Sequence, residues 1–191
     1  MGRGLFSDRL AKEYDPAMAA EPRVNGTIGW GDDHPSAAEW VITVRRPDVP
    51  DKRIPLPALA GLPRVDTTNE LKCVEGWSQI VRWGGVRFGD FLRAFDLPPP
   101  AGSPLQYLLL TTPGGGYSSA LDLTNALHPQ TLLCDAMNGA PLTEAHGGPI
   151  RLVLPIKYGI KNIKWLADIR ILTAKPTDYW TRRGYDWYAG L

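Results

Sequence analysis

The segment around Cys73 places a thiol where it could do chemistry. Lys72 precedes Cys73, Glu75 follows two positions later, and the apolar strand predicted over residues 71–74 ends in a Gly76-Trp77-Ser78 turn. A lone cysteine on an apolar strand is most often an inert core residue. A cysteine at a strand-to-loop junction beside charged residues is better placed to act as a thiolate. The residues alone leave both interpretations open.

A second group of reactive side chains lies in the segment 145–167. It carries Arg151, Lys157, Lys161 and Lys164 but no acidic residue, although the whole chain has a net charge of only +1. Glycines at positions 147, 148 and 159 would let backbone N–H groups approach a ligand closely. Lysine and arginine donate hydrogen bonds to phosphate and other anions. The segment therefore indicates either an anion site or a solvated basic loop.

Residue spacing argues against several other chemistries. The three glycines at 114–116 lack the G-x-G-x-x-G spacing and the following Lys-Ser/Thr of nucleotide-binding loops. No G-x-S-x-G or H-E-x-x-H motif occurs, and His34, His128 and His146 are far apart in the sequence. Cys73 and Cys134 are the only two cysteines, which is too few for a disulfide scaffold. We expect two independent thiols.

The composition describes a protein without a general electrostatic target. The 191 residues are 43% hydrophobic, enough for one compact domain, and the net charge of +1 gives no overall attraction to nucleic acid or a membrane. No apolar run approaches the roughly 20 residues of a membrane-spanning helix. The N-terminus lacks an apolar stretch behind its basic residues, so no export signal is visible and a cytoplasmic location is expected.

The elements that must position these groups are short, because 18 prolines and 20 glycines interrupt the chain. Strands are predicted over residues 40–44, 71–74, 107–111, 131–137, 150–155 and 167–173, and short helices over 86–95 and 121–126. Asn138-Gly139 favours a hairpin turn. Because strands and helices alternate without a βαβ rhythm, the predicted class is α+β, or mixed α/β, with a largely antiparallel core. Residues 1–38 form a predicted N-terminal wrapping arm, and residues 39–191 the single domain.

A family resemblance joins the two groups. Cys73-Val74-Glu75-Gly76-Trp77-Ser78, followed by Phe88-Gly89-Asp90-Phe91-Leu92, resembles the molybdopterin-binding domain of the sulfite oxidase family. The likeness continues through 126–133, 138–142 and 148–166, and it covers the chain from Trp40 to the C-terminus. Within the family, the chain is most similar to the catalytic subunits of bacterial protein-methionine-sulfoxide reductases. The resemblance implies the sulfite-oxidase-type fold and a molybdenum cofactor with one pyranopterin dithiolene.

The resemblance also implies roles for individual residues. Cys73 would be the protein ligand of molybdenum, and a soft thiolate suits such a metal. Glu75 would lie near the metal in a proton-transfer or orienting role, with a salt bridge to a basic loop residue as the alternative. The cofactor would be held by His146, Arg151 and the loop residues Lys161, Asn162, Ile163 and Lys164. Thr111 or Thr112 would match an active-site threonine, and Asn25 an asparagine of the N-terminal arm. Trp77, Trp83 and Trp165 would frame the pocket.

The implied reaction is two-electron oxygen-atom transfer, with molybdenum cycling between its +6 and +4 states. Sulfite oxidases carry an arginine-containing run where this chain has Glu75-Gly76-Trp77, which favours a sulfoxide- or N-oxide-type substrate. The alternatives are sulfite-oxidase-like oxidation of a small anion and a non-catalytic molybdopterin-binding or electron-transfer module. The chain lacks a C-x-x-C-H haem motif, so an external electron donor or acceptor such as a haem protein is expected. A monomer is expected because the family's C-terminal dimerisation domain has no counterpart in the 191 residues.

Overall fold

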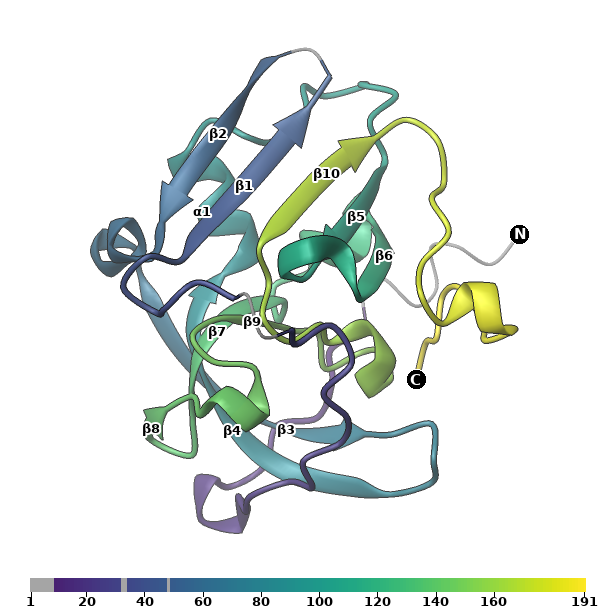
Figure 1. The fold of residues 1–191 in the computed structure, drawn as a ribbon. Coiled ribbons are helices and arrows are strands. Elements are labelled where there is room, and N and C mark those ends of the chain that lie inside the picture. Colours follow the sequence, from purple (N-terminus) through teal and green to yellow (C-terminus); the bar gives the residue numbers. More distant parts are fainter. Residues whose placement is uncertain (1–8, 32–33, 48) are drawn as a thin grey trace.

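Two five-stranded sheets form the framework of the protein (Figure 1). The structure is a computed structural model that describes residues 9–31, 34–47 and 49–191. One sheet has the order β2-β1-β10-β5-β6, with β1 (Val41–Arg46), β2 (Val49–Pro55), β5 (Tyr107–Thr111), β6 (Ser118–Asp122) and β10 (Asp168–Leu172). The other has the order β3-β4-β7-β8, with β9 also paired to β7, and contains β3 (Arg64–Lys72), β4 (Ser78–Arg87), β7 (Leu132–Met137), β8 (Ala140–Pro141) and β9 (Arg151–Val153).

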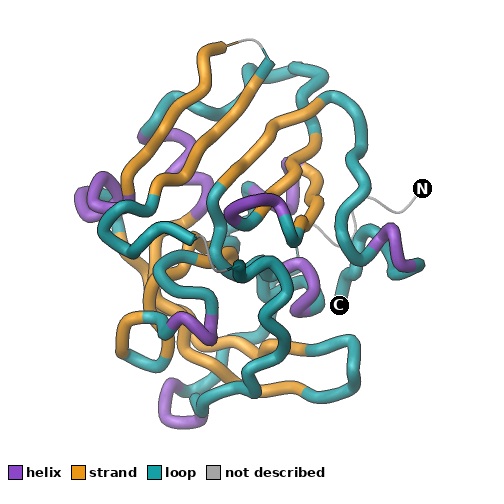
Figure 2. The backbone as a smooth tube through the Cα atoms, viewed as in Figure 1, coloured by secondary structure: helices purple, strands orange, loops and turns teal. Residues whose placement is uncertain are grey.

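The strand pairing is almost entirely antiparallel, as the irregular pattern of elements predicted. Only β1 and β10 pair in parallel among the described strands. The helices are short, and long loops connect the strands (Figure 2). The α-helices are α1 (Phe88–Ala94) and α2 (Leu123–Ala126), and short 3-10 helices cover Pro16–Met18, Leu56–Gly61, Pro113–Gly115, Glu144–His146, Gly159–Lys161 and Thr181–Arg183. The α+β class is therefore confirmed.

The main core lies against one face of the β1-containing sheet. In β1 the side chains alternate, with Ile42 and Val44 buried and their neighbours at least partly exposed. The same alternation buries Leu108 and Leu110 in β5, because successive side chains of a strand point to opposite faces. Helix α1 adds Phe91 to this cluster. A sheet packed on one face in this way gives a rigid frame for the loops at its ends.

The β3–β4 hairpin positions Cys73. The two strands pair along their whole length, from Arg64 opposite Val86 to Lys72 opposite Ser78. The connecting turn is closed by two backbone hydrogen bonds, from Cys73 N to Trp77 O at 2.9 Å and from Gly76 N to Cys73 O at 3.1 Å. Gly76 has φ +88°, a conformation that other residues rarely adopt. Cys73 is thus the first residue after a strand, at the junction that its sequence context predicted.

Three element predictions need correction. The strand predicted over 71–74 is the end of the longer β3, which stops at Lys72. Strand β4 was not predicted, and its residues Val86 and Arg87 were placed in a helix that begins only at Phe88. Residues 121 and 122 belong to β6, and helix α2 follows with the Asp122 side chain accepting a hydrogen bond from Asn125 N at 2.7 Å. Local pattern misplaced these boundaries because pairing with distant strands decided them.

Two irregular segments pack against this framework. The arm contacts the hairpin, where Ala20 N donates to Ile80 O at 3.0 Å and Glu13 forms an isolated antiparallel β-bridge with Asn69. The tail from residue 173 onward lies beside β6, with Tyr179 N donating to Ser118 O at 3.2 Å (Figure 1). No helix among the described residues is long and apolar enough to cross a membrane. The first eight residues, on which the expectation about export rests, lie outside the described part.

Candidate functional site

A cavity of about 230 Å³ adjoins the Cys73 turn. Five parts of the chain that are distant in sequence form its walls: the arm, the hairpin turn, the start of β6, the segment 146–165 and the tail. The lining residues are Pro22, Arg23, Asn25, Gly26, Ile28, Leu71, Lys72, Cys73, Glu75, Trp77, Tyr117, His146, Arg151, Gly159, Ile160, Asn162, Lys164, Trp165 and Trp180. Seven of the predicted site residues meet here, namely Asn25, Cys73, Glu75, His146, Arg151, Asn162 and Lys164.

Cys73 lies in the wall of this cavity next to a residue of the arm. Asn25 Nδ2 lies 3.4 Å from Cys73 Sγ and 3.3 Å from Glu75 Oε2, so one amide group spans both side chains. Trp77 Nε1 also donates to Glu75 Oε2, at 3.1 Å. Glu75 is exposed, and among the described residues its partners are these neutral donors and not a basic loop residue. The salt bridge considered as its alternative role is absent from the described part of the chain.

The surroundings of Cys73 favour the neutral thiol when no cation is bound. Burial raises the pKa of Cys73, the negative charge of Glu75 raises it further, and the Asn25 amide opposes both effects. A bound metal cation would reverse this preference, because coordination removes the thiol proton. The described residues contain no group of three or more His, Cys, Asp or Glu side chains placed to hold a metal ion.

Arg151 brings a positive charge to the cavity, and no acidic side chain among the described residues pairs with it. Its guanidinium is buried and donates from Nη1 to His146 O at 2.8 Å and from Nη2 to Asn162 O at 3.1 Å. The guanidinium also lies 5.0 Å from the centre of the Trp83 ring. Its Nε is buried and has no hydrogen-bond partner in the described part of the chain. Because burial lowers the pKa of Arg151 to about 10, the protein itself compensates this charge poorly.

Lys164 adds a second charge that is poorly compensated. Its Nζ donates to two backbone carbonyls, Ala145 O at 2.7 Å and Gly26 O at 3.2 Å. Burial, with a smaller contribution from the nearby Arg151, lowers the pKa of Lys164 to about 8. An anion beside Lys164 would raise that pKa again, because opposite charge favours the ammonium form.

The cavity as a whole is cationic. Arg23, Lys72, Arg151 and Lys164 line it, whereas Glu75 is the one acidic residue among the described lining residues. His146 is buried, and its Nε2 lies 3.1 Å from Glu21 Oε1 on the exposed arm. A soft thiol, an orphaned guanidinium nitrogen and an excess of positive charge fit a ligand that carries both a thiophilic metal and an anionic group.

The loop 158–164 forms one wall, and its residues do not all face the cavity. Asn162 lies in the wall, and its Oδ1 accepts from Leu154 N at 2.6 Å. Ile163 is buried in the main core. Lys161 is 1% exposed and turns away from the cavity to pair with Asp178. The structure therefore does not place the ammonium of Lys161 where the resemblance suggested a phosphate.

The two candidate threonines also lie outside the cavity. Thr111 is on the opposite, partly exposed face of the β5 strand. Thr112 is buried, and its Oγ1 accepts from Tyr117 N at 3.2 Å. Thr111 is on the partly exposed face of β5 and Thr112 follows the strand, and neither lines the cavity. Tyr117, which follows these threonines in the sequence, is the residue of this part of the chain that lines the cavity.

Two aromatic lining residues were missed by sequence reasoning. Tyr117 follows the glycines at 114–116, and its Oη donates to Ile160 O at 2.7 Å. Trp180 enters the wall from the tail. An isolated aromatic residue after a glycine loop or in a polar tail is a weak signal in a single sequence. The predicted framing tryptophans lie nearby, since Trp77 and Trp165 line the cavity and Trp83 stacks against Arg151. Cys134 is a fully buried free thiol, and burial raises its pKa to about 12.

Known proteins similar to this chain share its pattern. Residues 31–180 match the family model described as oxidoreductase molybdopterin binding domain. An Azospira oryzae protein provisionally named as a protein-methionine-sulfoxide reductase subunit, YedZ1, is 37% identical over 135 residues, which is 71% of this chain and 50% of that protein. The protein-methionine-sulfoxide reductase catalytic subunit MsrP of Xanthomonas axonopodis is 36% identical over 136 residues, which is 64% of this chain and 41% of that protein. The chain thus spans half or less of the length of these relatives.

The fold has a counterpart among solved structures. The sulfane dehydrogenase SoxCD from Paracoccus pantotrophus matches with a TM-score of 0.65 over 76% of this chain and 41% of that one, at 19% identity. This likeness concerns the fold. The family match covers most of the chain and includes the Cys73 turn, Arg151 and Lys164. The chain therefore belongs to the oxidoreductase molybdopterin-binding domain family, as its motifs predicted.

Proposed function

We propose that this protein is a molybdenum-dependent oxidoreductase in which Cys73 is the protein ligand of a molybdenum ion carried by one pyranopterin dithiolene. The observation that carries this proposal is the single soft thiol in the wall of a cationic cavity, next to Asn25 and Glu75. When bound, such a cofactor supplies two-electron oxygen-atom transfer. The protein supplies binding, orientation and proton movement.

The cationic part of the cavity would hold the pterin and its phosphate. Arg151 has an Nε without a hydrogen-bond partner among the described residues for this purpose, and Lys164 has an ammonium that donates to two backbone carbonyls. Asn162 fixes the adjacent loop by accepting from Leu154 N and donating to Tyr158 O. His146, buried below the arm, would contribute through its ring. The charges of Arg151 and Lys164 would thereby be compensated by the ligand and not by the protein.

Glu75 is the proposed proton carrier. Its carboxylate is exposed, adjacent to Cys73, and held in position by Asn25 and Trp77, which are neutral donors. A sulfoxide or N-oxide takes up two protons as its oxygen leaves as water, so a carboxylic acid beside the metal ligand is suited to that direction. The similarity to protein-methionine-sulfoxide reductase subunits supports the same substrate class.

Oxidation of a small anion such as sulfite is the second candidate reaction. The position of Glu75 disfavours it, because an exposed carboxylate next to Cys73 repels a dianion approaching the metal. Electrons for either reaction would come from or go to an external partner such as a haem protein. A monomeric state and a cytoplasmic location stay predictions, to be checked by sedimentation and by cell fractionation.

The reaction is tested by electron paramagnetic resonance of the purified protein during titration with candidate substrates. The +5 molybdenum signal belongs to partly reduced protein, in equilibrium with the +4 and +6 states. Methyl sulfoxides or N-oxides would take two electrons from the +4 state and should therefore diminish that signal, whereas the oxidised protein should gain no signal with sulfite. A signal that responds to sulfite alone would support the second candidate. Stoichiometric cofactor with no response to any of the three substrates would leave a non-catalytic cofactor-binding module.

A further inference from the structure

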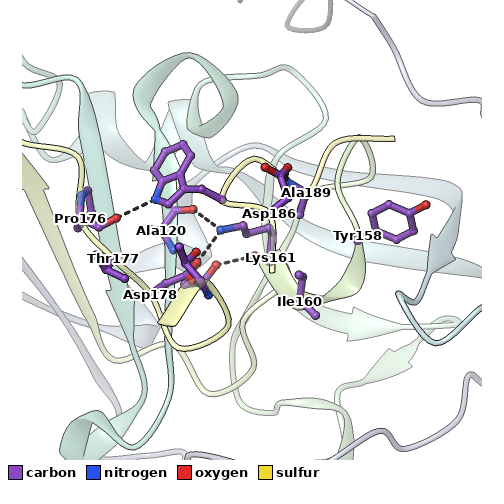
Figure 3. Close-up of polar contacts among 12 residues, drawn as sticks. Ala120, Tyr158, Ile160, Lys161, Pro176, Thr177, Asp178, Asp186 and Ala189 are labelled. Carbon is purple, nitrogen blue, oxygen red and sulfur yellow. Dashed lines mark hydrogen bonds and ion pairs between the residues drawn. The ribbon is translucent and has the colours of Figure 1, made fainter. Parts of the chain in front are cut away.

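Lys161 and Asp178 form a buried ion pair just outside the cavity. Lys161 Nζ lies 2.5 Å from Asp178 Oδ2, and it also donates to Ala120 O at 3.1 Å (Figure 3). Both side chains are almost inaccessible to solvent, at 1% and 2% exposure. A buried ammonium and a buried carboxylate stabilise each other only while both are present.

Asp178 ties together three parts of the chain. Its Oδ2 also accepts from Ala120 N at 2.9 Å in β6, and its Oδ1 accepts from Thr181 N at 2.8 Å in the tail. Burial alone would raise the pKa of Asp178, but the hydrogen bonds from Lys161 and Thr181 hold it below its usual value. Figure 3 shows the Lys161 side chain extending between Ala120 and Asp178. The loop, the strand and the tail thus meet at one carboxylate.

Residues next to each partner of this pair in the sequence line the cavity. Ile160 and Asn162, the neighbours of Lys161, line the cavity, and so does Trp180, two residues after Asp178. Tyr117 connects the two sides, because its Oη donates to Ile160 O and its ring centre lies 5.2 Å from that of Tyr179. A shift of Asp178 would therefore displace Trp180 and the loop together.

We propose that Lys161 and Asp178 are positioning residues that dock the tail against β6 and fix the Trp180 side of the cavity. Neither side chain lines the cavity. Removal of one partner leaves the other charge buried and unpaired, which favours local opening of the tail. The inference concerns the wall and holds whichever reaction the site performs.

The test is acrylamide quenching of Trp180 in the full chain. The chain has seven tryptophans, so the Trp180 contribution is the difference between each protein and its Trp180→Phe counterpart. The proteins compared are the wild type, Lys161→Met, the double variant Lys161→Met/Asp178→Asn, and the control Lys175→Met. Lys175 is an exposed tail lysine that lies 4.3 Å from the Trp187 ring centre, so its loss removes a tail charge but leaves both partners of the buried pair in place.

Lys161→Met should raise the quenching constant of Trp180 about twofold or more, because the tail opens locally. The double variant should return it part of the way toward the wild-type value, because no charge stays buried unpaired although the amide can accept from only one of Ala120 N and Thr181 N. Lys175→Met should leave it unchanged. Should Lys161→Met fail to fold, folding of the double variant with a wild-type Trp180 signal supports the pair. Unchanged quenching in Lys161→Met, equal quenching in Lys175→Met, or a double variant that is no better than the single one would overturn the proposal.

Discussion

Lys161 and Lys164 lie three residues apart in one loop and have opposite surroundings. Lys161 pairs with the buried carboxylate of Asp178, which also accepts hydrogen bonds from Ala120 N in β6 and Thr181 N in the tail. Lys164 lines the cavity, donates to two backbone carbonyls but to no acidic side chain in the described part of the chain, and has Arg151 as its charged neighbour. The first lysine is part of a closed structural unit, and the second belongs to a site that is incomplete without an anion. Charge that is left uncompensated by the protein indicates where a ligand binds.

The largest effect is expected from disrupting the buried pair of Lys161 and Asp178. Lys161→Met should lower the free energy of unfolding by about 3–5 kcal/mol, because it leaves the Asp178 carboxylate buried without its partner. Urea unfolding followed by circular dichroism measures this. Lys175→Met, on the exposed tail, should change it by less than about 0.5 kcal/mol. Equal stability of the two variants would mean that the buried pair is not a structural unit.

The next largest effect is expected in the cationic cavity, on retention of the cofactor. Arg151→Lys keeps the charge but loses the planar fork that bonds His146 O and Asn162 O and offers Nε to the cavity. Cofactor retention, measured by pterin fluorescence after gel filtration, should weaken about 10- to 100-fold, as for other residues that orient a cofactor. The surface variant Arg170→Lys should retain the cofactor fully. Full retention by Arg151→Lys would remove this residue from the site.

A smaller effect, with a pH signature, is expected at Lys164. Its pKa is lowered to about 8, so the side chain carries its positive charge below that pH and loses it above that pH. Affinity for a phosphate-bearing pterin should therefore fall as the pH rises above about 8, with the midpoint moved upward by the bound anion. Lys164→Met should bind about tenfold more weakly at pH 7, the loss of one charge-assisted hydrogen bond. The variant should also lose the pH dependence, and a variant with an unchanged profile would contradict this role.

The smallest effect on binding is expected from Glu75→Gln. The amide is nearly the same size and can still accept from Asn25 and Trp77, and Glu75 is outside the cationic set that would hold the pterin. Cofactor content should stay at the wild-type level, while turnover of a sulfoxide falls because the proton carrier is gone. A variant that loses the cofactor would place Glu75 among the binding residues instead.

Sequence reasoning succeeded where local chemistry and motif agreed. The junction at Cys73 follows from an apolar strand that ends at a glycine turn, and the acid-free segment contains Arg151 and Lys164, which line the cavity. It could not separate Lys161 from Lys164, because the partner Asp178 lies in a tail whose docking depends on long-range contacts. That Thr111 lies outside the cavity could not be read from the sequence either, since the packing of β5 in its sheet decides which side chains of the strand face the core. Tyr117 and Trp180 carried no motif, and only the assembled walls reveal them.

The central claim is that Cys73 binds the metal, and the molybdenum content of protein made in a molybdopterin-competent host tests it most directly. Cys73→Ser and Cys134→Ser form a matched pair, because each removes one of the two buried thiols and only Cys73 lines the cavity. Wild type and Cys134→Ser should contain about one molybdenum per chain and show the same +5 resonance spectrum, because Cys134 is not part of the metal site. Cys73→Ser should lose turnover and show an altered spectrum or no metal. Wild-type turnover and an unchanged spectrum in Cys73→Ser would contradict the account.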